Sequence, residues 1–126
     1  MALKVNVELK SPGVYEVKAE GSIDATTHAT LGSAVDALLK KSPTVVAFNM
    51  AKVTFVSSAG ISVVLAAEKT LRPRGGRVLL VELTPAVRKV FEIVRALPAQ
   101  QVFGSVAEMD EYLALMQRKV AEGEIQ

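Results

Sequence analysis

The sequence predicts a single α/β domain in which a mixed β-sheet of four to five strands carries about four packed helices. Two stretches near the start alternate apolar and polar residues as strands do. Further along, short apolar runs alternate with segments of helical periodicity, and Gly or Pro separates them. The 126 residues suit one domain, and because half of them are hydrophobic, a core can be buried.

The first two segments predict an antiparallel hairpin. Apolar and polar residues alternate over residues 3–10 and again over 14–20, and Ser11-Pro12-Gly13 provides the turn between them. Because side chains alternate across a strand, the apolar set, Leu9 included, is expected in the core. Charged residues such as Glu16 are expected on the solvent face.

A helix and a buried strand are predicted next. Asp24 with Thr26 or Thr27 can cap a helix, whose apolar stripe runs from Leu31 to Leu39 and ends before Ser42-Pro43. Residues 44–50 are almost continuously apolar. That pattern is typical of a central strand that is covered on both faces.

The stretch 53–61 joins an apolar, strand-like approach to a second helix. Small polar residues, Ser57 and Ser58, interrupt it, and Ile61, Val64, Leu65 and Leu71 then recur with helical spacing. Pro and Gly within residues 72–76 end that helix. The free N–H groups at its start would favour an anion, although capping by Ser57 or Ser58 is the commoner use of such residues.

The remaining elements are shorter. Residues 77–82 predict a strand, Thr84-Pro85 predicts a capped helix start, and residues 101–103 predict a short edge strand. Ser105 and Glu108 form a capping box ahead of the last helix. We expect the folded domain to span residues 1–119 and residues 120–126 to form a polar C-terminal tail.

The strand-to-helix loops at Asp24, Ser57-Ser58 and Thr84 are expected on one side of the sheet, where α/β folds usually place their sites. Catalytic groups do not assemble there. His28 is the only histidine and nothing in the sequence ties it to a serine, and the chain has no cysteine. We therefore expect no enzyme activity, no metal and no cofactor.

Charge and hydropathy limit the partners. The net charge of +2 does not predict nucleic-acid binding, and no apolar run reaches the length that membrane insertion needs, so we expect a cytoplasmic protein. The basic cluster of Lys69, Arg72, Arg74 and Arg77 could hold a phosphate, an acidic partner or RNA, but a solvated loop is the commoner use of such a cluster.

Three segments together resemble a known family. Gly21-Ser22-Ile23-Asp24, the stretch 53–61, and Gly75–Val78 followed by Thr84–Phe91 occur in the order and spacing of the STAS domain of bacterial anti-anti-sigma factors. The resemblance covers nearly the whole chain. It implies the mixed-sheet fold given above and a role in regulating transcription through protein partners.

The resemblance also implies a set of site residues. In this family an anti-sigma factor that is also a serine kinase, and that supplies the ATP site, phosphorylates a Ser in an Asp-Ser-Ser/Thr-Gly pattern. Matched residue by residue, Ser58 becomes the phosphoacceptor, while Ser57 replaces the Asp and Ala59 the second hydroxyl. The implied docking face consists of Asp24, Ser57, Ser58, Gly60 and Ile61. A monomer or weak dimer is expected.

A second interpretation stays open. The chain would then be a STAS module that is not phosphorylated and serves assembly, in a signalling scaffold or a lipid-transport ATPase complex. In that case Ser57 and Ser58 would only cap the helix.

Overall fold

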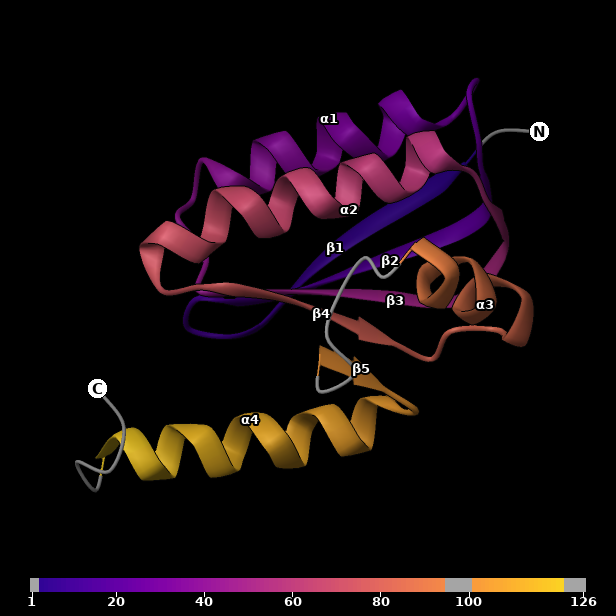
Figure 1. Ribbon diagram of the computed structural model, residues 1–126. Coiled ribbons are helices and arrows are strands. Elements are labelled where there is room, and N and C mark those ends of the chain that lie inside the picture. Colours follow the sequence, from indigo (N-terminus) through magenta and orange to yellow (C-terminus); the bar gives the residue numbers. More distant parts are fainter. Residues whose placement is uncertain (1–2, 95–100, 122–126) are drawn as a thin grey trace.

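The computed structural model describes residues 3–94 and 101–121, and it contains the predicted mixture of strands and helices (Figure 1). The elements in chain order are β1 (Lys4–Ser11), β2 (Val14–Ile23), α1 (His28–Leu39), β3 (Val45–Val56), α2 (Ser58–Leu71), the 3₁₀ helix η1 (Arg72–Arg74), β4 (Arg77–Val81), α3 (Pro85–Val94), β5 (Val102–Phe103) and α4 (Val106–Ala121).

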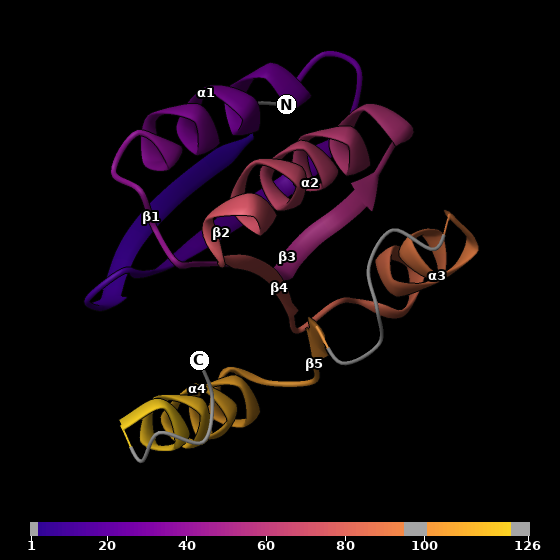
Figure 2. The same ribbon diagram turned by 60° about the vertical axis from the view of Figure 1, so that its left-hand side comes forward.

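The five strands form one mixed sheet in the order β1-β2-β3-β4-β5. β1 and β2 pair as an antiparallel hairpin, and β2, β3, β4 and β5 run parallel to one another. Helices α1 and α2 lie side by side on one face, whereas α4 lies below the opposite face (Figures 1 and 2). The predicted fold class is confirmed, and the segment from residue 44 onward is the central strand, as expected.

The sheet has an apolar core on each face. The larger core fills the space between the sheet and α1, α2 and α3, and it includes Phe48 from β3 and Leu31 from α1. The smaller core joins α4 to the other face through Ala47, Leu79 and Met109. Because β3 and β4 contribute to both cores, their sequences are continuously apolar rather than alternating.

The hairpin departs from the predicted alternation in two places. Leu9 is 58% exposed and Val7 is 42% exposed, because β1 is the edge strand and its second half extends beyond the cover of α1. Glu16, predicted on the solvent face, is 2% exposed. Its carboxylate accepts a hydrogen bond from Nδ2 of Asn49 at 3.0 Å and lies 3.8 Å from Nζ of Lys18, which compensates for its burial.

Two helical expectations are also corrected. Leu65 is 37% exposed, and the buried stripe of α2 instead includes Ala67 and Glu68. The predicted side-chain cap of α1 is absent, since its N-cap Thr27 makes no side-chain cap hydrogen bond and Asp24 instead accepts a hydrogen bond within the preceding turn.

The strand predicted over residues 44–50 continues to Val56, so the apolar approach to Ser57 belongs to β3.

The later predictions agree with the structure. Val87 donates its backbone N–H to Oγ1 of Thr84 at 3.4 Å, so Thr84 caps α3. Oγ of Ser105 accepts the N–H of Glu108 at 3.2 Å, while the Glu108 carboxylate accepts the N–H of Gly104 at 2.7 Å.

The last helix is longer than predicted. α4 continues to Ala121, two residues into the predicted tail, and residues 122–126 of that tail lie outside the described part of the chain.

Candidate functional site

The site at the start of α2 is built where β2 and β3 end together. Ile23 and Val56, the last residues of these parallel strands, pair with each other, and the N–H of Ser57 donates to the carbonyl of Ile23 at 2.8 Å. The loop that begins at Asp24 and the loop that carries Ser57 and Ser58 are therefore neighbours. These two of the three predicted loops do come together.

The Thr84 loop does not join them. The last β3–β4 pair is Asn49 with Val81, so beyond the end of β4 the strand β3 continues with β2 as its neighbour in the sheet. Within residues 3–94 and 101–121, no hydrogen bond links Thr84 to either of the other two loops. The common direction of parallel strands predicted the shared edge, but the unequal strand lengths separate Thr84 from the site.

Ser57 is the N-cap of α2. Its backbone is extended, with φ −95° and ψ 175°, and its Oγ accepts the N–H of Gly60 at 3.4 Å while its carbonyl accepts that of Ile61 at 3.0 Å. One of the free N–H groups at the helix start is thereby satisfied. Of the two serines considered, Ser57 therefore caps the helix.

Ser58 is the first residue of α2 and is exposed. Its carbonyl accepts the hydroxyl of Ser62 at 2.9 Å, one turn along the helix. The first turn of α2 contains no acidic residue. The Ser58 side chain thus projects from a helix start whose partial positive charge is not offset from within that turn.

Gly60 and Ile61 are the buried residues of the first turn of α2, and they pack the loop against the sheet. A Cβ at Gly60 would lie 2.6 Å from Cγ2 of Ile23 and 2.8 Å from Cγ2 of Val56, so the helix approaches the strand ends too closely for any other residue. Ile61 is 4% exposed and belongs to the main core. Both residues are buried and position the exposed part of the loop.

Asp24 closes its own turn with hydrogen bonds. Its Oδ1 accepts the backbone N–H of Thr26 at 2.9 Å and the hydroxyl of Thr26 at 2.8 Å, and it also accepts the N–H of Thr27 at 3.1 Å. The side-chain and backbone hydrogen bonds from Thr26 lower the pKa of the Asp24 carboxyl. Beside Ser58 the loop therefore presents a fixed negative charge at neutral pH.

Phe55 is an exposed aromatic residue that the sequence reasoning did not single out. It lies three residues before Ser58 and its side chain is 52% exposed. The β2–β3 register shifts between Gly21 and Ser22, so Ser22 pairs with Phe55 and Thr54 is skipped. Such an irregularity turns a side chain away from the alternating pattern and often occurs beside functional sites.

His28 lines a groove between α1 and α2. The groove has a volume of about 480 Å³ and is lined by His28, Ala59 and Ser62 among other residues. In the described ranges, His28 makes no side-chain hydrogen bond to Ser57 or Ser58. The site thus holds the exposed hydroxyl of Ser58, the carboxylate of Asp24 and the exposed ring of Phe55 at the end of β2 and β3.

A comparison of the sequence with models of known protein families finds one match. The model of the STAS domain family matches residues 7–109, which include both site loops. The chain belongs to the STAS domain family. BtrV of Bordetella bronchiseptica, named as a candidate anti-sigma factor antagonist, is 33% identical to this STAS protein over 84 residues, or 67% of this chain and 72% of BtrV.

Solved structures of other proteins share the fold. The anti-sigma factor antagonist SpoIIAA in its unphosphorylated form has a TM-score of 0.77 at 18% identity, with 88% of this chain and 96% of SpoIIAA covered. Its phosphorylated form has a TM-score of 0.71 at 19% identity, with 87% and 99% covered. A sulfate transporter family protein of Wolinella succinogenes has a TM-score of 0.73 at 16% identity, with 88% and 93% covered. At these identities the likeness shows the fold.

Proposed function

We propose that this STAS protein is an anti-sigma factor antagonist that binds an anti-sigma factor with serine kinase activity and is released when that kinase phosphorylates Ser58. The observation that carries the proposal is the position of Ser58, an exposed hydroxyl on the first residue of α2 beside the Asp24 loop. The family match and the relationship to BtrV support it.

The structure of the loop is compatible with a phosphoryl group on Ser58. A phosphoserine adds a charge of about −2 and three acceptor oxygens, which the positive end of a helix tolerates. Ser57 keeps the cap in either state, because its Oγ bonds the N–H of Gly60 and does not depend on Ser58. Phosphorylation is therefore expected to leave this domain folded and to act on the partner.

The docking face in this proposal consists of the exposed part of the two loops. Ser58 and Phe55 come from the β3–α2 junction, and Asp24 comes from the neighbouring turn. An exposed apolar ring and a carboxylate at the same strand ends suit a partner surface with an apolar patch and a cation. Adding the phosphoryl charge to that surface opposes docking by desolvation and by repulsion from partner carboxylates.

Titration calorimetry with the anti-sigma kinase encoded in the same genome tests this function. We expect Ser58→Glu to weaken binding at least tenfold, or about 1.4 kcal/mol, because the glutamate places a charge in the interface. Ser62→Glu is the matched control, since Ser62 is exposed one turn further along the same helix, and it should bind within about threefold of the original protein. Equal binding by all three proteins contradicts the proposal.

The assembly-module alternative gives a different partner. Capture of native partners with the unmodified protein should yield an ATPase of the anti-sigma kinase type. Recovery of a transporter subunit or a scaffold protein in its place, with no mass change on Ser58, would assign the chain to the assembly class.

A further inference from the structure

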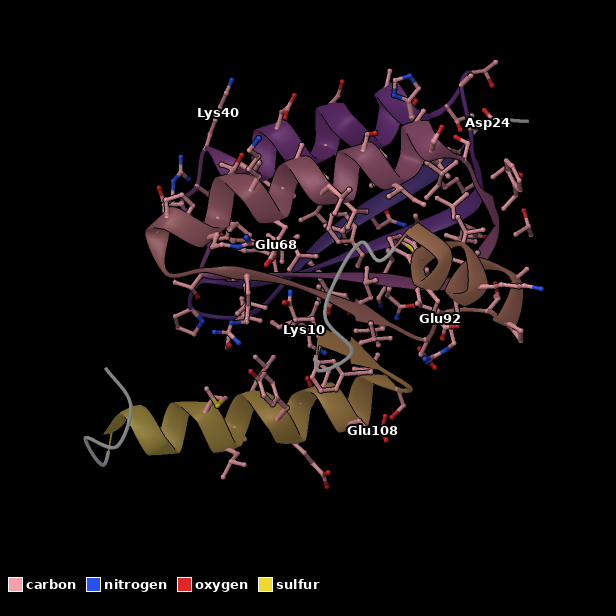
Figure 3. All side chains as sticks on the ribbon, in the orientation of Figure 1. Lys10, Asp24, Lys40, Glu68, Glu92 and Glu108 are labelled. Atoms are coloured by element: carbon pink, nitrogen blue, oxygen red, sulfur yellow. The ribbon has the colours of Figure 1, made fainter. Side chains whose placement is uncertain are left out.

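The end of the molecule opposite the Ser58 loop is strongly cationic. It is formed where α1 and α2 finish and where β4 begins, and in Figure 3 Lys40 and Asp24 mark opposite ends of the α1–α2 layer. Six of the 15 Lys and Arg residues lie there, all of them exposed. This cationic end consists of Lys40, Lys41, Lys69, Arg72, Arg74 and Arg77.

Contacts between segments make this end one surface. Nη1 of Arg74 donates to the carbonyl of Leu39 at 3.4 Å, which joins η1 to the end of α1. Nζ of Lys41 lies 5.8 Å from the ring centre of Tyr15, on β2. Tyr15 pairs in turn with Leu9 on β1. The cations therefore border the hairpin, and the exposed Leu9 of β1 lies next to the ring that Lys41 covers.

The positive charge of this surface is largely uncompensated by ion pairs. Arg72 has a carboxylate neighbour, Glu68, at 4.0 Å, and Glu68 is itself buried. Within the part of the chain that the structure describes, none of the other five cations has a carboxylate oxygen within 4.0 Å. Asp36, one turn before Lys40, is the nearest acidic residue on α1. Arg77 donates to the hydroxyl of Tyr112 at 3.1 Å and Arg74 to a carbonyl, and because these acceptors are uncharged the positive charge remains available to an external anion.

The spread of the charges indicates what kind of anion fits. Point charges at the ends of α1, α2 and η1 and at the start of β4 match an extended anionic surface rather than one small anion, which needs converging donors. Leu9, 58% exposed, adds an apolar contact at the border. For nucleic acid the surface offers little stacking, because the ring of Tyr15 lies under Lys41.

We propose that the cationic end binds an anionic lipid bilayer, with Leu9 and the neighbouring hairpin at the lipid interface. Because Asp24 and Ser58 lie at the opposite end, the docking face would point away from the bilayer and stay open to a protein partner. This peripheral attachment needs no spanning segment, and none of the described helices is long and apolar enough to cross a membrane. The proposal does not depend on the phosphorylation of Ser58.

Co-sedimentation with vesicles tests the proposal. We expect the full chain to bind vesicles of phosphatidylcholine with phosphatidylserine, to bind vesicles of phosphatidylcholine alone far more weakly, and to be released by salt. Each Lys or Arg close to an anionic surface strengthens partitioning about fivefold, so Lys40→Gln with Arg74→Gln should lower the partition coefficient about 25-fold.

The matched control keeps the net charge of that variant. Arg88→Gln with Lys89→Gln removes two exposed cations from α3, away from the cationic end, and should change partitioning less than about twofold because salt screens distant charges. An equal loss in both double variants, or equal binding to neutral vesicles, overturns the proposal. Tighter binding to polyuridylic acid than to the anionic vesicles overturns it in favour of a nucleic acid.

Discussion

The two ends of α2 differ in where they place their polar groups. At the start, Ser57 caps the helix from the surface, Ser58 is exposed, and the half-buried Asp24 accepts hydrogen bonds from the neighbouring Thr26. Near its other end, the Glu68 carboxylate is buried and accepts hydrogen bonds from the N–H of Val78 at 3.3 Å and from Nε2 of Gln101 at 3.2 Å. One end presents polar groups outward, and the other uses them to hold the fold together.

This difference predicts that a change of charge at the start of α2 would leave the domain folded. The Gln101 side chain also donates to the carbonyl of Val78 at 2.6 Å, so α2, β4 and the residues before β5 form one buried polar network. That network fixes α2 on the sheet by contacts that do not involve Ser58. A change of charge at the helix start can then alter binding while the helix stays in place.

Gly60→Ala is expected to have the largest effect, because it breaks the packing of the start of α2. The new Cβ would meet Ile23 and Val56 at 2.6 and 2.8 Å, and overpacking of this kind costs about 2–3 kcal/mol of unfolding free energy. Gly32→Ala is the control, since its Cβ would have Val63 as a neighbour at 3.9 Å, and it should stabilise by about 0.5–1 kcal/mol. Urea denaturation measures both, and effects of the same sign would contradict the packing described.

Glu68→Ala is expected to rank second, because it breaks the network at the other end. It removes the acceptor for Val78 and one acceptor for Gln101 in a buried setting, which costs about 1–2 kcal/mol. Lys69→Ala, the exposed neighbour, should stay within about 0.5 kcal/mol. The two variants differ by one position in the chain, so similar unfolding free energies would show that the network contributes little.

The smallest effect concerns the pKa of Asp24, the half-buried carboxylate at the start of α2, in contrast to the buried carboxylate of Glu68 near its other end. Hydrogen bonds from Thr26 lower the Asp24 pKa, so Thr26→Val should raise that pKa toward its ordinary value of about 3.9. Thr30→Val, an exposed change on α1, should leave it unaltered. Carbon-13 NMR of the carboxyl group reports the pKa, and an unchanged midpoint in Thr26→Val would exclude this cause.

The sign of the matching stability effect follows from the lowered pKa. The carboxylate form of Asp24 stabilises the fold at pH values above the unfolded-state pKa of about 3.9, and this contribution is lost as the pH falls through the folded-state pKa. The stability difference between the original protein and Thr26→Val should therefore shrink below about pH 4.

Local signals in the sequence were enough for much of the fold and of the site. The capping role at Ser57 and the Thr84-Pro85 helix start depend on neighbours within three or four residues. The apolar run that became β3 required coverage on both faces wherever it lay in the sheet. These features could be predicted because their physical causes are short in range.

The features that escaped prediction depend on distant partners. Glu68 looks like a solvated helix position until Val78 and Gln101, ten and 33 residues away, are brought beside it. Leu65 fits the apolar spacing of α2 as well as Ala67 does, and only the packed sheet decides which of them faces inward. Phe55 is turned outward by a register shift against β2. No single segment contains that information.

Intact-mass spectrometry after incubation with the cognate anti-sigma kinase and Mg-ATP tests the central claim most directly. We expect the protein to gain the mass of one phosphoryl group, Ser57→Ala to gain it as well, and Ser58→Ala to gain nothing. An unchanged mass for the original protein, or a gain that persists in Ser58→Ala, would contradict the assignment of Ser58 as the switch.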